Sequence, residues 1–213
     1  MSNVAFLAVE GPIGAGKTSL ARAISQQFNF HLLKEIVDEN PFLNKFYEDI
    51  DEWSFQTEMF FLCNRYKQLE DIQKKVLFNQ QATVADYHIF KNLIFANRTL
   101  QNQQLEKYVR IYDILTKDMP SPNLIIYIHA SLETLMKRIE KRGREFEKNI
   151  DPAYLQQLSD DYEHFIHTFE QQNNNTSILR IDGDQLDFVE NEEDLQFIFD
   201  EIVNRIQRSN QQR

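Results

Sequence analysis

The sequence contains a single cysteine and no apolar stretch long enough to cross a bilayer. One cysteine cannot form a disulfide within the chain, so the sequence suits a reducing compartment, and we expect a cytoplasmic protein. Cys63 stands among Phe60, Phe61 and Leu62, which predicts a small buried apolar side chain. The first nine residues lack the basic segment of a signal peptide and lead into a glycine-rich loop, so they predict a strand.

The chain also lacks an excess of positive charge, because its formal net charge is −10 at pH 7. Non-specific binding to nucleic acid or to anionic membranes needs a cationic surface, so we expect neither kind of partner. No segment rich in proline, glycine or serine separates two domains, and 213 residues with 42% hydrophobic composition can bury a sizeable core. We therefore expect one domain over residues 1–208 and a polar tail over residues 209–213.

Short apolar runs alternate with stretches of helical periodicity. Five segments predict buried strands: Val4 to Val9, Phe30 to Ile36, Ala82 to Asp86, Asn123 to His129 and Ser177 to Asp182. Apolar residues spaced by three and four predict helices over Lys17 to Phe28, Trp53 to Val76 and Leu132 to Lys141, and in a last segment that includes Leu195 and Ile206. The alternation indicates parallel βαβ units and therefore an α/β fold with a doubly wound sheet.

One glycine-rich motif gives the first indication of chemistry. Gly11, Gly16, Lys17 and Thr18 form the pattern G-x-x-x-x-G-K-T, directly after the first predicted strand and at the start of the first predicted helix. Glycines let backbone N–H groups turn toward phosphate oxygens, and the helix N-terminus adds positive partial charge. Lys17 would reach the β- and γ-phosphates of a nucleoside triphosphate, and the Thr18 hydroxyl would bind Mg²⁺. The predicted cradle comprises Gly11, Gly14, Ala15, Gly16, Lys17, Thr18 and Ser19.

Two carboxylates follow predicted strands, at the edge of the sheet where open α/β proteins place their chemistry. Glu35 closes the second predicted strand and could accept a proton from a substrate hydroxyl that attacks the γ-phosphate. Asp86 closes the third and could hold Mg²⁺, directly or through water. The alternative for each is a solvated turn residue, which is the commoner role of an acidic side chain at a strand end.

A basic cluster lies in the second half of the chain and consists of Lys137, Arg138, Lys141, Arg142 and Arg144. Helical spacing places Arg138, Lys141 and Arg142 on one face, and Gly143 then interrupts the helix. Such a segment can close over phosphates as a lid and neutralise charge in a transition state. The alternative is a solvated basic face paired with neighbouring glutamates.

Five ordered segments resemble the deoxynucleoside kinases, most closely their bacterial deoxyguanosine kinase branch: EGPIGAGKTSL, EIVDENPFLNKFYED, EWSFQTEMFFLCNRYKQLE, VADYHIFKNLIFA and RIEKRGREFEK. The resemblance covers about Ala5 to Phe188. It implies a P-loop NTPase-type fold with a five-stranded parallel sheet flanked by helices, often in a homodimer. It also implies γ-phosphoryl transfer from Mg·ATP to the 5′-hydroxyl of a purine deoxynucleoside, most of all deoxyguanosine.

The resemblance implies roles for individual residues. Glu35 matches the base that activates the sugar 5′-hydroxyl, and Tyr47 and Glu147 match the pair that holds the 3′-hydroxyl. Glu58 stands where many relatives have a base-reading glutamine, and Arg65 matches an arginine beside the base. The expected catalytic residues are Glu35, Lys17 and the lid arginines Arg138, Arg142 and Arg144. The expected substrate contacts are Glu35, Tyr47, Glu58, Arg65, Asp86 and Glu147, with Thr18 and Asp86 for the metal.

One segment departs from the family pattern. Many members have an arginine and a serine after the acidic residue of the third strand, whereas this chain has Asp86, Tyr87 and His88. The family's arginine is therefore missing, and Lys91 and Arg98 are candidates for the cation that replaces it.

Alternatives remain for the function and for one residue. The function could be that of a kinase that prefers deoxyadenosine, or of a regulatory protein that uses the P-loop as a switch. Glu35 and the lid favour a kinase, because a switch needs no base for a second substrate. Glu58 could be a surface helix residue that pairs with a lysine.

Overall fold

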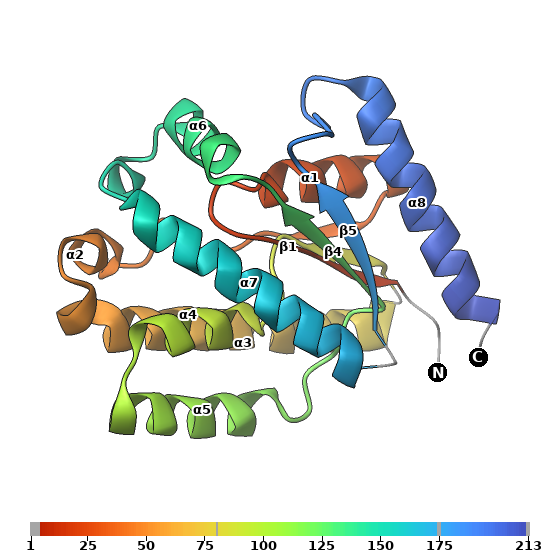
Figure 1. Cartoon of the computed structure of the whole chain (residues 1–213). Coiled ribbons are helices and arrows are strands. Elements are labelled where there is room, and N and C mark those ends of the chain that lie inside the picture. Colours follow the sequence, from red (N-terminus) through yellow and green to blue (C-terminus); the bar gives the residue numbers. More distant parts are fainter. Residues whose placement is uncertain (1–4, 80, 174–175, 212–213) are drawn as a thin grey trace.

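Five parallel strands form the centre of the structure, in the order β2-β3-β1-β4-β5 (Figure 1). The computed structural model describes residues 5–79, 81–173 and 176–211. The strands are β1 (Phe6–Glu10), β2 (His31–Leu33), β3 (Thr83–Ala85), β4 (Leu124–His129) and β5 (Ser177–Asp182). In the central strand, Ala8 lies opposite Ala85 of β3 and Ile125 of β4. The predicted doubly wound, five-stranded parallel sheet is therefore confirmed.

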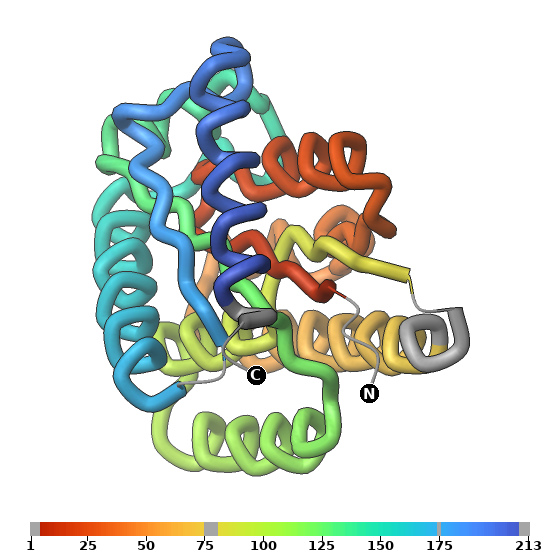
Figure 2. The backbone as a smooth tube through the Cα atoms, turned by 90° about the vertical axis from the view of Figure 1, so that its right-hand side faces the viewer, coloured from red at the N-terminus to blue at the C-terminus, as the bar shows by residue number. Residues whose placement is uncertain are grey.

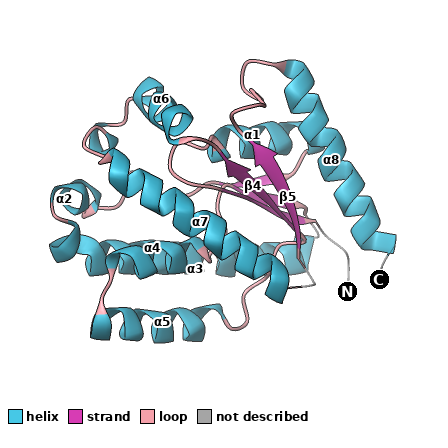
Figure 3. Ribbon diagram, in the orientation of Figure 1, coloured by secondary structure: helices cyan, strands magenta, loops and turns pink. Residues whose placement is uncertain are grey.

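Helices cover both faces of the sheet (Figure 3). They are α1 (Lys17–Phe28), α2 (Leu43–Glu48), α3 (Ile50–Asn79), α4 (Lys91–Thr99), α5 (Asn102–Thr116), α6 (Leu132–Arg142), the 3₁₀ helix η1 (Glu145–Glu147), α7 (Pro152–Gln172) and α8 (Glu192–Gln211). α1 and α8 lie on one face, α3, α4 and α7 lie on the other, and α5 is outermost (Figures 1 and 2). Among the described residues, no helix combines the length and apolar character that a membrane span requires.

The apolar runs became strands because both faces of the sheet are covered. All five residues of β1 are buried, and so are the first five of β4. A strand that is buried on both faces needs a continuous apolar sequence rather than an alternating one. The large core therefore centres on β1 and β4, with α1 and α8 packed on one side and α7 on the other.

Several boundaries differ from prediction. β2 ends at Leu33, so Glu35 follows the strand by two residues instead of closing it. The reason is pairing: β2 pairs only with β3, whose three residues end opposite Leu33. β1 continues through Glu10, while Val4 lies outside the described residues. α8 continues through Gln211, into the segment predicted as a polar tail, and residues 212–213 lie outside the described part.

The sequence analysis missed α2, α4, α5 and α7. α7 carried a readable signal, because Asp151 caps it by accepting a hydrogen bond from Ala153 N at 2.8 Å and Pro152 occupies its first turn. Its buried residues recur at helical spacing: Tyr154, Leu155, Leu158, Tyr162 and Ile166. α2 is only six residues long, too short for a periodic pattern to stand out.

The prediction that Cys63 is buried is wrong, since its side chain is exposed. α3 turns a different face inward, which carries Leu62, Arg65, Leu69 and Ile72. Each residue advances about 100° around a helix, so the neighbour of a buried leucine points away from the core.

Substituting a buried and an exposed isoleucine tests which side chains form the core. Ile126 in β4 is fully buried, whereas Ile114 in α5 is 77% exposed. Ile126→Ala should lower the free energy of unfolding by about 2–5 kcal/mol, because it removes buried methyl groups and leaves a cavity. Ile114→Ala should change it by less than about 0.5 kcal/mol. Equilibrium unfolding in guanidinium chloride measures both, and equal losses would contradict this distribution of buried and exposed side chains.

Candidate active site

The loop between β1 and α1 has the backbone of a phosphate cradle. Gly11, Gly14 and Gly16 all have positive φ, at 151°, 87° and 97°. A Cβ at Gly11 would lie 2.3 Å from the carbonyl oxygen of Ile128, which is a clash. Gly16 is the N-cap of α1 in a left-handed conformation that a side chain would strain. These glycines bring the loop tightly against β4 and open the N-terminus of α1 toward a cavity.

That cavity has a volume of about 620 Å³ and is bounded by the P-loop, the ends of β2 and β3, and helices α2, α3, α4 and α6. Most predicted site residues line it: Gly14, Gly16, Lys17, Thr18, Ser19, Glu35, Tyr47, Glu58, Arg65, Asp86, Arg138, Arg142, Arg144 and Glu147. Gly11 and Ala15 belong to the same loop but do not line the cavity. The structure thus brings together residues that are up to 133 positions apart, from Gly14 to Glu147.

Lys17 is folded back on its own loop. Its ammonium donates to the carbonyl oxygens of Gly11 at 2.7 Å and of Pro12 at 2.8 Å. Burial lowers its pKa to about 7, and the nearby charge of Lys91 acts in the same direction. An anion bound in the cradle would reverse this effect and favour the charged ammonium.

Asp86 connects the P-loop helix to the segment after β2. One of its oxygens accepts from the Thr18 hydroxyl at 2.7 Å, and the other accepts from the backbone N–H of Glu35 at 2.6 Å. Burial raises the pKa of Asp86, as does the negative charge of Glu35. No group of three or more His, Cys, Asp or Glu side chains in the described ranges forms a metal-binding cluster. Mg²⁺ needs no such cluster, since it commonly takes one or two protein oxygens together with phosphates and water, and the Thr18–Asp86 pair fits that requirement.

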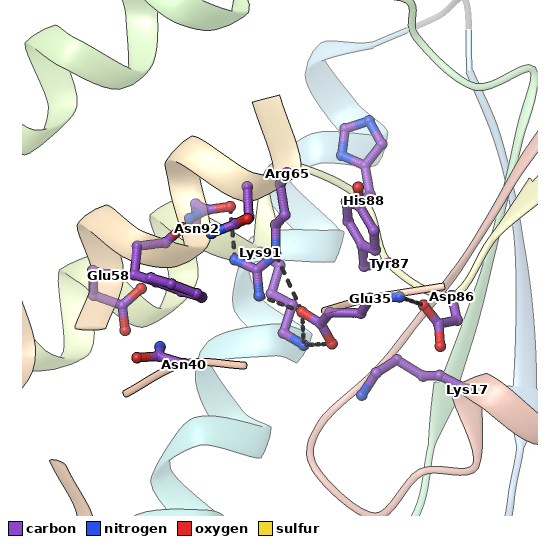
Figure 4. A network of polar contacts seen from close by, with 12 residues as sticks. Lys17, Glu35, Asn40, Glu58, Arg65, Asp86, Tyr87, His88, Lys91 and Asn92 are labelled. Carbon is purple, nitrogen blue, oxygen red and sulfur yellow. Dashed lines mark hydrogen bonds and ion pairs between the residues drawn. The ribbon is translucent and has the colours of Figure 1, made fainter. Parts of the chain in front are cut away.

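Glu35 is a buried carboxylate held by two cations from different helices (Figure 4). Arg65 of α3 donates to one oxygen through Nε at 3.1 Å and also through its terminal NH₂ group. Lys91 of α4 donates to both oxygens, at 3.0 and 2.9 Å. Burial alone would raise the pKa of Glu35, but the two cations outweigh it and hold the pKa well below its usual range. Glu35 is therefore charged at neutral pH.

Arg65 is itself fixed by neighbouring helices. Its guanidinium donates to Asn92 Oδ1 at 2.7 Å, and Asn92 in turn donates to the Tyr108 hydroxyl at 2.8 Å. The ring of Phe61 lies 4.7 Å from the guanidinium carbon. Residues from α4 and α5, two helices that sequence analysis missed, thus hold a predicted site residue in place.

Glu58 is 1% exposed, and its Oε2 has no hydrogen-bond partner among the described atoms. The alternative of a surface residue paired with a lysine is therefore wrong. Burial raises the pKa of Glu58 to about 8, although Arg65 and Lys91 act in the opposite direction. A buried polar group without a partner is unusual in folded proteins, and a bound ligand or water is one explanation for it. Because Glu58 lines the cavity, the structure makes it a candidate ligand contact.

The arginines of the predicted lid make specific contacts. Arg138 donates to the carbonyl oxygens of Ala15 at 3.2 Å and Gly183 at 2.8 Å, which joins α6 to the P-loop. Arg142 donates twice to Glu147, at 3.0 and 2.6 Å, and Arg144 donates to the same carboxylate at 3.4 Å. Burial and the charge of Glu147 raise the pKa of the Tyr47 hydroxyl.

The alternative, a solvated basic face paired with Glu140, Glu145 and Glu147, is met in part, because Arg142 and Arg144 pair with Glu147 and the two lysines of the cluster pair with other glutamates. Lys137 pairs with Glu133 at 2.6 Å, and Lys141 pairs with Glu190 at 3.0 Å, with exposed side chains in each pair.

Of the two candidates that could replace the missing family arginine, only one lies beside Glu35. Lys91 lies against Glu35, whereas Arg98 pairs with Asp161 of α7 at 2.6 Å. The sequence signal was the spacing from Asp86, which places Lys91 at the start of the next helix.

The deoxynucleoside kinase family model matches residues 7–207. The chain belongs to the deoxynucleoside kinase family. A deoxyguanosine kinase of Bacillus subtilis (strain 168) is 57% identical over 198 residues, which cover 93% of this chain and 96% of that protein. A deoxyadenosine/deoxycytidine kinase of the same strain is 30% identical over 209 residues, with 94% and 93% covered.

Solved structures agree on the fold of this deoxynucleoside kinase. A deoxyadenosine kinase from M. mycoides with bound dCTP superposes with a TM-score of 0.78 at 23% identity, and the match covers 93% of this chain and 99% of that chain. The same protein with bound dATP gives a TM-score of 0.79 at 24% identity. The family and the fold that the sequence motifs predicted are both confirmed.

The buried position of Glu58 makes stability depend on pH. Its folded pKa, about 8, lies above the ordinary value of a glutamate, 4.5. The folded state therefore binds the extra proton, so stability should fall as pH rises from about 4.5 to about 8. Glu58→Gln removes this contribution. The difference in free energy of unfolding, variant minus wild type, should therefore increase by at least about 1 kcal/mol from pH 5 to pH 8.5. Urea unfolding at the two pH values measures this gain, and a constant difference would contradict a buried, ionisable Glu58.

Proposed function

We propose that this deoxynucleoside kinase transfers the γ-phosphoryl group of ATP to the 5′-hydroxyl of a purine deoxynucleoside, deoxyguanosine in preference, for nucleotide salvage. The observation that carries the proposal is one cavity shared by the P-loop, with Lys17, and by the carboxylate of Glu35. A phosphate cradle alone would suit any nucleotide-binding protein, but a cradle facing a charged carboxylate suits transfer to a hydroxyl group. The 57% identical relative supports the choice of deoxyguanosine.

In the reaction, the 5′-oxygen forms a bond to the γ-phosphorus while the bond between that phosphorus and the β,γ-bridging oxygen breaks, and ADP leaves. The 5′-hydroxyl proton passes to Glu35, whose two oxygens lie against the cations of Arg65 and Lys91. Those cations make Glu35 a weak base. Phosphoryl transfer proceeds through a loose transition state that needs little proton removal at first, so Glu35 acts chiefly by orienting the hydroxyl and accepts the proton late.

The phosphates of ATP would occupy the loop from Gly11 to Ser19, with Lys17 exchanging its carbonyl contacts for phosphate oxygens. Arg138, Arg142 and Arg144 would neutralise charge on the transferring group. Thr18 and Asp86 would hold Mg²⁺, because their oxygens converge from α1 and the end of β3. When bound, Mg²⁺ supplies positive charge that screens the phosphates.

Tyr47 and Glu147 would bind the 3′-hydroxyl of the sugar. Glu147 already accepts hydrogen bonds from Arg142 and Arg144, so one carboxylate would contact both the nucleoside and the lid. Nucleoside binding and the position of the lid arginines are then linked through a single side chain.

Glu58 and Arg65 would read the base. Guanine presents the donors N1–H and N2–H₂ along one edge, and an ionised carboxylate can accept both. Arg65 uses three of its five N–H donors on Glu35 and Asn92, which leaves two for the acceptors O6 and N7 of guanine. Adenine has a donor at N6 and an acceptor at N1, which suits a protonated carboxyl group or an amide. The base preference thus depends on the ionisation of Glu58.

The resemblance to the family supports a homodimer, and the one unpaired cysteine supports a cytoplasmic location. The net charge of −10 is compatible with small-molecule substrates as the partners, without nucleic acid or membrane.

A nucleoside panel tests the proposed function. With Mg·ATP, purified protein should release ADP in the presence of deoxyguanosine with the highest kcat/KM, ahead of deoxyadenosine, deoxyinosine and deoxycytidine. Glu35→Gln should lower kcat about 10²- to 10⁴-fold while nucleoside binding persists, and Lys17→Ala should be inactive. ADP release that does not depend on any nucleoside would favour a regulatory nucleotide-binding protein and would contradict the proposal.

The base preference has its own test. Glu58→Gln should shift the ratio of kcat/KM from deoxyguanosine toward deoxyadenosine by at least about tenfold, the low end of one bidentate contact. In the wild type, kcat/KM for deoxyguanosine divided by kcat/KM for deoxyadenosine should rise between pH 6.5 and pH 9, as Glu58 ionises. In the variant this ratio should stay constant. Glu52→Gln, an exposed glutamate on the same helix, is the matched control. An unchanged ratio with activity intact would show that Glu58 does not contact the base.

A further inference from the structure

Lys91 is the first residue of α4 and is 7% exposed, which is uncommon for a lysine. Both hydrogen bonds that its ammonium makes within the described residues go to Glu35. An ammonium has three donors, so one remains for a ligand. Lys91 also lines the cavity, together with Lys17 and Asp86.

Lys91 experiences opposing electrostatic effects, because the Glu35 carboxylate stabilises it while other positive charge lies close by. The N-terminus of a helix carries positive partial charge, which repels a lysine in the first turn. Lys17 lines the same cavity, so two lysines share one enclosed space. A multiply charged anion that enters between the two lysines would be attracted by both.

The backbone around Lys91 is fixed from several sides. The N–H of His88 donates to the buried carboxylate of Glu10 at 2.6 Å, and the N–H of Lys91 donates to the carbonyl of His88 at 3.1 Å. Glu10 ends β1 and also accepts from the N–H of Gly11 at 3.0 Å. The turn that begins α4 is therefore joined to the P-loop itself, which sets the place of the Lys91 ammonium relative to the cradle.

We propose that Lys91 is a catalytic cation of this kinase, which contacts the transferring phosphoryl group while it holds Glu35 beside the attacking hydroxyl. The inference rests on the proposed function. Lys17 approaches the phosphates from the P-loop, and Lys91 approaches from the acceptor side, where Glu35 lies. Arg65 cannot take this part, because Asn92 and Glu35 already fix its guanidinium on α3. Lys91 adds charge stabilisation without forming or breaking a covalent bond.

Three variants on α4 test the proposal. Lys91→Met keeps the aliphatic stem and removes the charge, and it should lower kcat by about 10²- to 10³-fold with the KM for deoxyguanosine changed by less than about fivefold. Lys91→Arg restores a cation and should recover at least about tenfold in kcat. Arg98→Met removes the other cation of the same helix. Arg98 lies about two turns after Lys91 and pairs with Asp161, so this variant should leave kcat within about twofold.

Restoring the charge separates catalysis from a structural role, because Lys91→Arg should recover kcat only if the cation itself acts on the reacting group. If Lys91→Met folds poorly, rescue of Lys91→Ala by added ethylammonium is measured instead, and a rise in kcat with amine concentration supports the proposal.

Two results would overturn the inference while the wild type is active. One is a Lys91→Met enzyme with unchanged kcat, and the other is a Lys91→Ala enzyme whose kcat no added amine restores. Loss of thermal stability with kcat intact would likewise reduce Lys91 to a structural residue. A wild type that phosphorylates no nucleoside would instead overturn the proposed function, and the inference with it.

Discussion

A buried carboxylate between two buried cations determines how this site is assembled. Glu35 comes from the segment after β2, Arg65 from α3 and Lys91 from α4, so three separate parts of the chain meet at one ion cluster. Such a cluster contributes little net stability, because removing its charges from water costs about as much as their attraction returns. Its members are nevertheless interdependent, since the loss of either cation leaves a buried charge poorly compensated.

The sheet supplies the frame for that cluster. Helices on both faces exclude water from β1 and β4, and the polar side chains collect just beyond the carboxyl ends of the strands. β1 leads into the P-loop, β2 into Glu35 and β3 into Asp86, so the order β2-β3-β1 places the three groups in sequence along one edge. The hydrogen bonds from Thr18 and from the backbone of Glu35 to Asp86 then connect the three segments directly.

Sequence reasoning succeeded where the signal is local. The glycine motif and the apolar runs depend on neighbouring residues, so the P-loop and the sheet could be predicted from them, whereas Tyr47, Glu58, Arg65 and Glu147 were predicted only through the resemblance to the family. It failed where tertiary packing decides. Cys63 is exposed because of the rotation of α3 about its axis, which depends on contacts with α4 and α5. β2 is short because β3 ends opposite Leu33, and Lys91 reaches Glu35 only once α4 is in place.

The exposed thiol of Cys63 has a practical consequence. It lies on α3, the helix that carries Glu58 and Arg65 on its inward side, and the chain has no other cysteine. A thiol-reactive fluorophore would therefore attach at a single known place, outside the cavity but on a helix that lines it. The same exposure makes the protein prone to cross-linking between molecules in air, because two surface thiols on separate copies can form a disulfide that one chain alone cannot.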